Sequence, residues 1–269
     1  MNIVAADGAR IAYRIDGPIE KTADHATIVF LNSLGTNLGM WEPQLGQMSR
    51  HMRVVRYDQR GHGSSEVRPG PYTIELLGRD LVALLDALEV ERVRLCGLSL
   101  GGMVALWVAA HHPERVERAV FANTAARIGT LDTWNARISA VSSGGMAAVR
   151  DAVLGRFLSG EFRSRKPEVA RMIGDMIGAT NPEGYTAACA AVRDADLHPV
   201  LPKIRAPSLV ICSEWDESTP AEQGKELHAA ISGSKLVRLP RAAHLSNVEQ
   251  SDLFTAAVTD FLEQKETQR

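Results

Sequence analysis

The sequence predicts an α/β protein with a mostly parallel central sheet, helices on both faces of the sheet and a helical cap inserted after the sixth strand. Short apolar runs typical of buried strands alternate with helical patterns in the first part of the chain. The alternation stops after residue 124, where only helical patterns follow, and strands resume near residue 208. The chain has 269 residues, of which 45% are hydrophobic, so it can bury a sizeable core.

Local patterns define the expected elements. Asp7 and Gly8 are turn-forming residues between two short apolar segments of residues 2–15, which predicts a β-hairpin. Thr73 is a candidate N-cap for a helix that extends to about Leu88. Near-continuous apolar runs predict strands that are buried on both faces. The remaining strands are expected at 27–31, 53–57, from 93 to the turn at 97, 116–121, 207–212 and 235–239, and the last helix at about 251–264.

The interruption divides the chain into two expected domains. Residues 1–124 and 198–269 are expected to form the core, and residues 125–197 the helical cap. Parallel strands carry their ligand sites at the carboxyl edge of the sheet, and an insertion at the end of a strand lies above that edge. We therefore expect the cap to cover the site.

Composition excludes several classes of function. The net charge of −2, with both signs interspersed, argues against a nucleic-acid partner. No apolar run approaches the ~20 residues that span a bilayer, and the N-terminal residues lack a signal-peptide pattern. Cys96, Cys189 and Cys212 are widely spaced, as is typical of core thiols in a reducing compartment. We expect a cytoplasmic enzyme with a small-molecule substrate, and the sequence does not predict its oligomeric state.

The segment Gly97-Leu98-Ser99-Leu100-Gly101 has the G-x-S-x-G pattern between an expected strand and an expected helix. In that context a sharp turn pushes the central side chain out of the sheet, and the glycines remove Cβ atoms that would clash. The helix N-terminus behind Ser99 favours developing negative charge. Ser99 is therefore the candidate nucleophile.

A serine nucleophile needs a base, and the sequence contains eight histidines. His244 directly follows the last expected strand, which places it at the same sheet edge as Ser99. His111 and His112 lie a helix length away from Ser99, and His62 belongs either to the pocket or to a structural turn. His244 is the candidate base.

The acid that orients the base is expected after the strand at 207–212. Glu214, Asp216 and Glu217 all lie in that loop. We select Asp216 because the order Ser99, Asp216, His244 is the nucleophile–acid–histidine order of this architecture.

An oxyanion hole requires two N–H donors. One would be the backbone N–H of Leu100, and the other would come from the loop after the first buried strand, most plausibly Leu34. No spacing of histidine and cysteine indicates a metal site, and no glycine-rich phosphate loop opens a helix, so we expect neither a metal nor a cofactor.

The chain resembles the α/β-hydrolase superfamily over its full length, through GLSLGG, YDQRGHGSS, WDESTP and AAHLSN. More narrowly it is similar to the 3-oxoadipate enol-lactonases of the β-ketoadipate pathway of aromatic catabolism. That closer match depends on LNSLGTNLGMWEPQ, YDQRGHGSSEVRPGPYTIE, ANTAARIGT with Trp134, and EGY at 183–185. Asn32-Ser33 replaces the His-Gly of many superfamily members and is shared with these enol-lactonases.

This resemblance implies hydrolysis of a small enol-lactone that bears a carboxylate, through an acyl-enzyme, to give 3-oxoadipate. The carboxylate requires a donor, for which the indole N–H of Trp134 is the first candidate and Arg137, one helical turn further, the second. Alternatives that keep the same triad are a carboxylesterase and a hydrolase of carbon–carbon bonds. A non-catalytic ligand receptor on the same fold is a third hypothesis.

Overall fold

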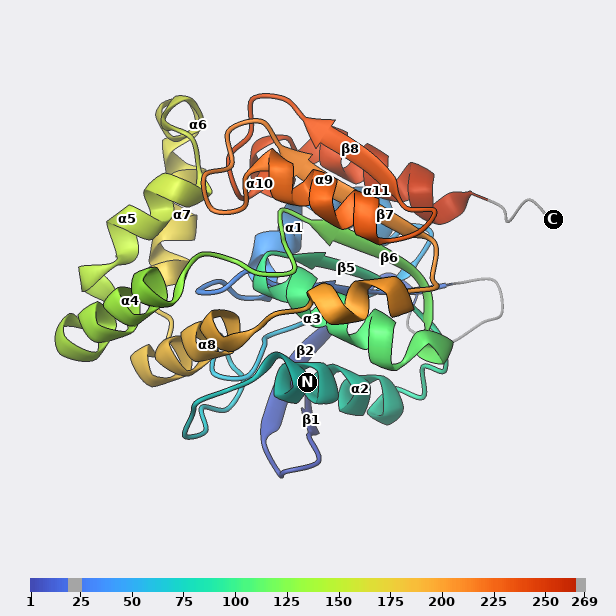
Figure 1. Ribbon diagram of the computed structural model, residues 1–269, viewed down its shortest axis with the longest axis horizontal. Helices are drawn as coiled ribbons and strands as arrows, with labels where there is room; N and C mark the ends of the chain where they lie inside the picture. The colour runs from blue at the N-terminus through green and yellow to red at the C-terminus, as the bar shows by residue number, and fades with distance from the viewer. Residues whose placement is uncertain (19–25, 265–269) are drawn as a thin grey trace.

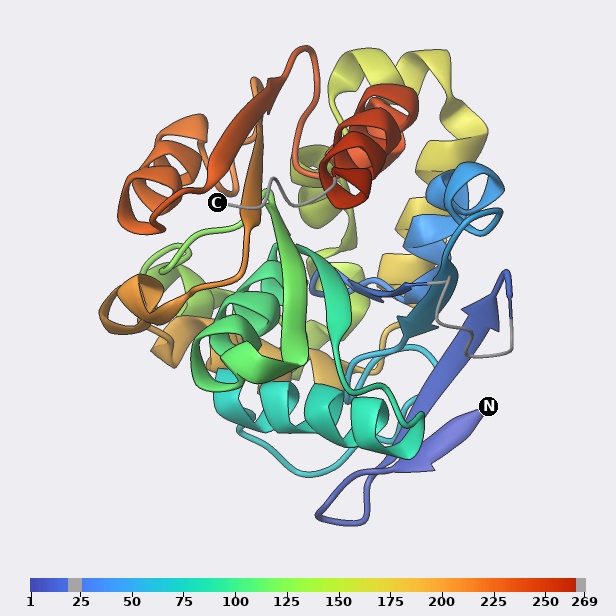
Figure 2. The same cartoon turned by 90° about the vertical axis from the view of Figure 1, so that its right-hand side faces the viewer.

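The computed structural model describes residues 1–18 and 26–264, and these contain an eight-stranded sheet. Its strands are β1 (Asn2–Val4), β2 (Arg10–Asp16), β3 (Thr27–Leu31), β4 (Arg53–Tyr57), β5 (Val93–Leu98), β6 (Val116–Ala122), β7 (Ser208–Ser213) and β8 (Lys235–Leu239). The strand order is β1-β2-β4-β3-β5-β6-β7-β8. β2 is antiparallel to both β1 and β4, whereas the other pairs are parallel. The predicted N-terminal hairpin and mostly parallel sheet are confirmed, and Figure 2 shows the hairpin at the outer edge of the sheet.

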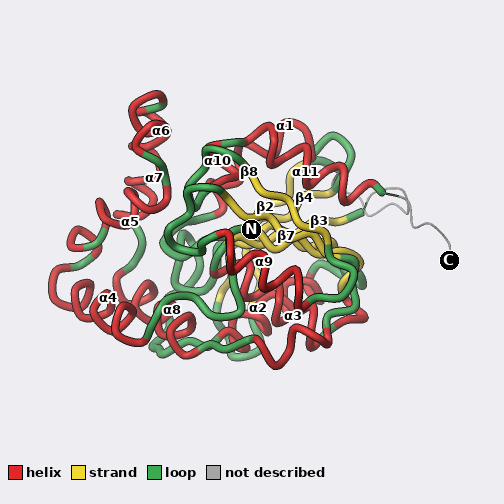
Figure 3. Tube along the Cα trace, turned by 45° about the horizontal axis from the view of Figure 1, so that its top comes forward, coloured by secondary structure: helices red, strands yellow, loops and turns green. Residues whose placement is uncertain are grey.

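Helices cover both faces of the sheet (Figure 3). One face carries α1 (Glu42–Met48) and α11 (Ser251–Glu263), and the other carries α2 (Ile74–Ala87), α3 (Leu100–His111) and α9 (Ala221–Ala230). The predicted helices near 73–88 and 251–264 are confirmed. The apolar pattern did not predict α1 and α10 (Ser246–Glu249), because such short helices show no clear apolar period. Short 3-10 helices are η1 (Leu38–Trp41), η2 (Pro113–Arg115), η3 (Met146–Ala148) and η4 (His198–Lys203).

The segment between β6 and β7 is helical, which confirms the predicted insertion after the sixth strand. It contains α4 (Leu131–Gly144), α5 (Arg150–Phe157), α6 (Gly160–Arg165), α7 (Pro167–Gly178) and α8 (Pro182–Asp194). These helices lie together on the left of Figure 1, where α4 packs against α8 and α5 against α7. We propose that residues 125–197 form the cap domain. Part of the predicted core, residues 19–25 and 265–269, lies outside the described residues.

The strands at the centre of the sheet form the core. Every residue of β3 and β4 is buried, because helices cover both faces of these strands. β8 is partly exposed, as is usual for a strand at the edge of a sheet. Across residues 1–18 and 26–264, no helix combines the length and apolar character needed to cross a membrane.

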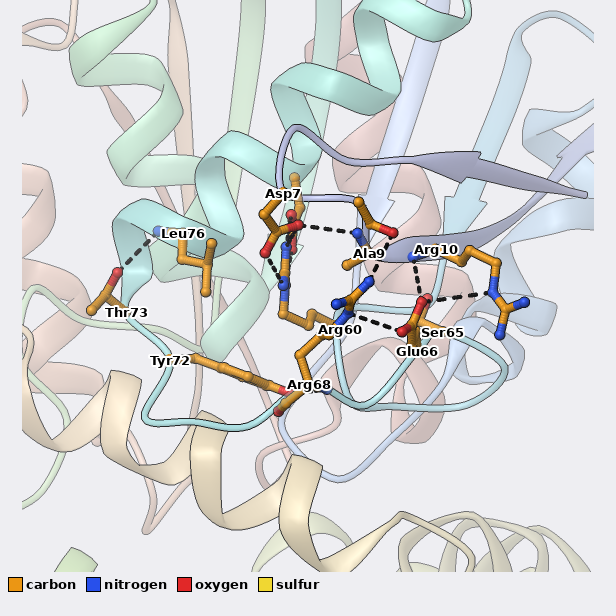
Figure 4. Close-up of polar contacts among 12 residues, drawn as sticks. Asp7, Ala9, Arg10, Arg60, Ser65, Glu66, Arg68, Tyr72, Thr73 and Leu76 are labelled. Carbon is orange, nitrogen blue, oxygen red and sulfur yellow. Dashed lines mark hydrogen bonds and ion pairs between the residues drawn. The ribbon is translucent and has the colours of Figure 1, made fainter.

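A buried ionic cluster fastens the N-terminal hairpin to the loop after β4 (Figure 4). The Arg60 side chain is 2% exposed and forms ion pairs with Asp7 of the hairpin turn and Asp80 of α2, each with an N–O distance of 2.6 Å. A buried guanidinium without partners would be strongly destabilising, and Asp80, whose side chain is 3% exposed, is its buried partner. The hydrogen bond from Arg60 lowers the pKa of Asp7 to about 2.

The low pKa of Asp7 predicts an acid-dependent contribution to stability. A carboxyl whose folded-state pKa is depressed from 3.8 to about 2 stabilises the fold above about pH 4, and loses that effect as pH falls toward 2. The Asp7 side chain is 47% exposed, so we expect Asp7→Asn to lose about 1 kcal/mol or less at pH 6. Urea unfolding of both proteins at pH 6, 4 and 3 should show the difference shrinking with acid. A constant difference would contradict this account.

Candidate active site

Ser99 lies at the sharp turn between β5 and α3. Its backbone has φ 58° and ψ −118°, a strained conformation for a residue with a side chain. Its N–H donates to the Ala122 carbonyl of β6 at 3.0 Å. A Cβ atom at Gly97 would lie 2.2 Å from the Gly101 carbonyl oxygen, and one at Gly101 would lie 2.2 Å from that of Leu31. The two glycines of the motif therefore allow the close backbone approach that the turn requires.

Asp216 and His244 meet in a buried pair at the carboxyl edge of the sheet. Nδ1 of His244 lies 2.9 Å from Oδ2 and 3.1 Å from Oδ1 of Asp216. The side chain of His244 is 2% exposed and that of Asp216 is 0% exposed. A carboxylate at Nδ1 places the proton on that nitrogen and leaves Nε2 as the acceptor.

The protein holds Asp216 as a carboxylate. Burial acts to raise its pKa, but the electrostatic interaction with His244 and hydrogen bonds from His244 and Thr219 outweigh burial and lower the pKa. Glu214 and Glu217, which share the loop, are exposed. Of the three acids in this loop, Asp216 is therefore the one that the structure places against His244.

Further donors to Asp216 escaped the sequence analysis. Asn123 Nδ2 and Thr219 Oγ1 donate to Oδ2 at 2.8 and 2.7 Å, and the N–H groups of Ser218 and Thr219 donate to Oδ1. Asn123 also accepts a hydrogen bond from Ser246 Oγ at 2.6 Å. The position of Asn123 directly after a buried strand was the available indication, since polar residues at strand ends gather at one edge.

Ser99 and His244 line one cavity of about 290 Å³ between the sheet edge and the helical insertion. The insertion contributes Trp134 and Arg137 of α4 and Arg156 and Phe157 of α5, among others. The Phe157 ring lies against the His244 imidazole, with centroids 5.2 Å apart, and its carbonyl accepts the N–H of Leu245 at 2.9 Å. The insertion thus contacts the histidine loop directly and encloses the site.

The two candidate oxyanion donors flank this site. Leu34 lines the cavity, and Leu100 is the first residue of α3, where an N–H has no intrahelical acceptor. Among the residues that the structure describes, neither N–H has a hydrogen-bond partner. Both groups are therefore available to an incoming oxyanion.

The structure corrects the proposed role of Trp134. Its indole N–H donates to the carbonyl of Ile128 at 2.6 Å, so the group suggested as the donor to a substrate carboxylate is already used. Arg137 stacks on the Trp134 ring, with its guanidinium carbon 4.7 Å from the ring centroid. Within the described residues, neither Arg137 nor Arg156 has an ion-pair partner, although the exposed Glu217 lines the same cavity. Arg156 lies in no recognised motif and was not predicted from the sequence.

His62 is buried and does not line the cavity. The structure therefore places His62 in a structural turn and not in the pocket. His111 and His112 lie at the far end of α3 from Ser99.

Comparison with known proteins agrees with this architecture. The model of the alpha/beta hydrolase fold family matches residues 26–251. The chain therefore belongs to the α/β-hydrolase family.

Within that family the chain resembles the 3-oxoadipate enol-lactonases. It is 39% identical to 3-oxoadipate enol-lactonase 2 of Acinetobacter baylyi over 236 residues, 88% of each chain. It is 36% identical to 3-oxoadipate enol-lactonase 1 of the same organism, over 97% of this chain and 96% of the relative. The crystal structure of the enol-lactonase from Burkholderia xenovorans LB400 superposes with a TM-score of 0.95 at 44% identity, covering 98% of this chain and 100% of the other.

Proposed function

We propose that the protein hydrolyses 3-oxoadipate enol-lactone to 3-oxoadipate by a Ser99–His244–Asp216 triad. The observation that carries this proposal is the cavity itself, in which Arg137 and Arg156 share about 290 Å³ with Ser99 and His244. Neither arginine has an ion-pair partner among residues 1–18 and 26–264. A small ester that bears a carboxylate matches that combination of size and charge. The names of the similar enol-lactonases support the choice of lactone.

In the first half-reaction, Nε2 of His244 takes the proton of the Ser99 hydroxyl as Oγ attacks the ring carbonyl carbon. Asp216 holds the imidazole in the required tautomer through Nδ1. The N–H groups of Leu34 and Leu100 stabilise the tetrahedral oxyanion. The ring C–O bond then breaks, and the leaving oxygen departs as a delocalised enolate. This enolate takes up the proton that His244 holds and becomes a ketone, so the imidazole is neutral again for the second half-reaction. Because this leaving group is stabilised, ring opening needs little acid assistance.

In the second half-reaction, water replaces the Ser99 hydroxyl as the nucleophile. His244 removes a proton from the water as its oxygen attacks the acyl carbon, and the same two N–H groups stabilise the second oxyanion. Collapse of this intermediate restores the Ser99 hydroxyl and releases 3-oxoadipate. The helical insertion limits the cavity volume and keeps bulk water from the acyl-enzyme.

The test is an absorbance assay of enol-lactone disappearance with purified protein, run beside a neutral p-nitrophenyl ester and a carbon–carbon ring-cleavage product. We expect kcat/KM for the lactone to exceed that for either other substrate by at least about 100-fold, since each well-placed interaction contributes 1–3 kcal/mol. A higher kcat/KM for the ester would identify a carboxylesterase instead. Stoichiometric binding without turnover would identify a receptor.

The two arginines of the cavity predict a charge-specific effect. Arg137→Met and Arg156→Met are each expected to lower kcat/KM for the lactone about 10- to 100-fold, mainly through KM, because a charge-assisted hydrogen bond contributes about 1.5–3 kcal/mol. The neutral ester should change less than about threefold. Arg163→Met, an exposed arginine of α6 outside the cavity, is the matched control. Equal losses on the lactone and the neutral ester would contradict carboxylate binding.

A further inference from the structure

We propose that His62 is a positioning residue, which holds the oxyanion loop, residues Asn32–Thr36, so that the Leu34 N–H faces the reacting carbonyl. The proposal rests on the proposed function for one point, the role of the Leu34 N–H as an oxyanion donor. His62 does not line the cavity, so its effect on the reaction would act through the loop.

Two hydrogen bonds define the state of the His62 imidazole. Nε2 lies 3.0 Å from the backbone N of Gly35, and Nδ1 lies 3.1 Å from the carbonyl oxygen of Arg60. A carbonyl oxygen only accepts, so Nδ1 carries the proton. Nε2 is consequently the acceptor for the Gly35 N–H, and the neutral imidazole is the form that fits both partners.

The surroundings favour this neutral form. His62 is 2% exposed, and burial lowers its pKa to about 4. An imidazolium would turn a second N–H toward the N–H of Gly35, with no acceptor between them. Above about pH 5 the imidazole therefore serves as a permanent acceptor rather than a proton carrier.

The Gly35 peptide is held from two sides. His62 belongs to the loop after β4 and accepts the Gly35 N–H. Just after α7, the Thr180 hydroxyl lies 3.2 Å from the Gly35 carbonyl and 3.1 Å from the Met176 carbonyl, so its one hydrogen is shared between these two acceptors. Gly35 directly follows Leu34, so its hydrogen bonds determine the orientation of the residue whose N–H would bind the oxyanion. With Thr180 still in place, loss of the His62 contact should loosen the turn without unfolding it.

A matched pair of substitutions separates the acceptor from the bulk of the side chain. The amide oxygen of His62→Gln reaches the position of Nε2 and can accept the Gly35 N–H. The shorter amide of His62→Asn reaches only the position of Nδ1 and cannot. Removal of one oxyanion donor lowers kcat by about 10²–10³. We expect His62→Asn, which misplaces the donor, to lower kcat about 10- to 100-fold with KM changed less than threefold, and His62→Gln to remain within about threefold of wild type.

Binding of a boronic acid to Ser99 provides a second measurement. A purely structural role of His62 would not change the boronate dissociation constant selectively. The tetrahedral boronate adduct places an oxygen in the oxyanion hole. By contrast, KM for a p-nitrophenyl ester stays constant when loss of an oxyanion donor slows acylation and deacylation by the same factor. In His62→Asn, the boronate dissociation constant should rise about 10- to 100-fold while KM stays nearly constant. Tyr72→Phe is the control, since it removes the hydroxyl contacts with Arg68 in the same loop and leaves Gly35 untouched.

The outcomes separate this proposal from the proposed function. Equal weakening of boronate and ester binding, or a His62→Gln variant as impaired as His62→Asn, would overturn the positioning role. Failure of the wild type to hydrolyse the lactone, with boronate binding and ester turnover intact, would change only the substrate. A wild type that binds no boronate would remove the oxyanion assignment and this inference with it. Thermal unfolding of each variant verifies that the compared proteins are folded.

Discussion

Replacing Ser99 with alanine is expected to lower kcat about 10⁴- to 10⁶-fold while the protein folds normally. The substitution removes the nucleophilic oxygen and leaves the β5–α3 turn unchanged, because the Ser99 backbone N–H still donates to Ala122. No other group in the proposed mechanism can replace this hydroxyl as the nucleophile. The residual rate would come from the oxyanion donors and from binding alone.

The measurement for Ser99→Ala is single-turnover and steady-state hydrolysis of the lactone, together with thermal unfolding. Ser143→Ala, an exposed serine on α4, is the matched control and should keep the wild-type rate. A Ser99→Ala variant with a rate within tenfold of wild type would remove Ser99 from the mechanism. Formation of a covalent adduct by the wild type with a serine-directed phosphonate, absent in the variant, provides an independent test.

Replacing Asp216 with asparagine is expected to lower kcat about 10⁴-fold. An asparagine amide would present either its NH₂ group or a weaker acceptor to Nδ1 of His244, and so would no longer hold the imidazole in the required tautomer. The amide NH₂ would also face several donors, because Asn123, Ser218 and Thr219 all donate to the carboxylate. Some loss of stability should accompany the loss of rate.

The neighbouring carboxylate supplies the control for Asp216. Glu214→Gln changes an exposed side chain of the same loop, and we expect less than a twofold change in kcat. Parallel kinetics of the two variants at one pH distinguish the acids directly. A large loss in Glu214→Gln with near-normal activity in Asp216→Asn would show that the wrong carboxylate was selected.

Much of the fold could be predicted because buried strands have an unmistakable composition. The strands at 27–31, 53–57 and 235–239 have the predicted bounds, and those beginning at 93, 116 and 208 differ by a few residues at most at their ends. The short helix α1 could not be predicted, since seven residues with two buried side chains show no clear period.

The candidate site was also predictable only in part. Parallel strands bring their carboxyl ends to one edge, so residues that follow β5, β7 and β8 could be assigned to one place from chain order. Which partner satisfies each polar group there depends on contacts of about 3 Å, which no spacing in the sequence specifies. Trp134 shows the consequence, because its N–H binds Ile128 rather than facing a substrate.

Apolar periodicity and the order of motifs are properties of the chain, so the parallel sheet, the helical insertion and the three candidate catalytic side chains could be assigned from the sequence alone. Other features depend on the folded arrangement: Asn123 and Thr219 donate to Asp216, Arg156 joins Arg137 in the cavity, and His62 accepts the Gly35 N–H. These contacts join residues from different elements. Hydrogen bonds and ion pairs form at short range between groups that folding alone brings together.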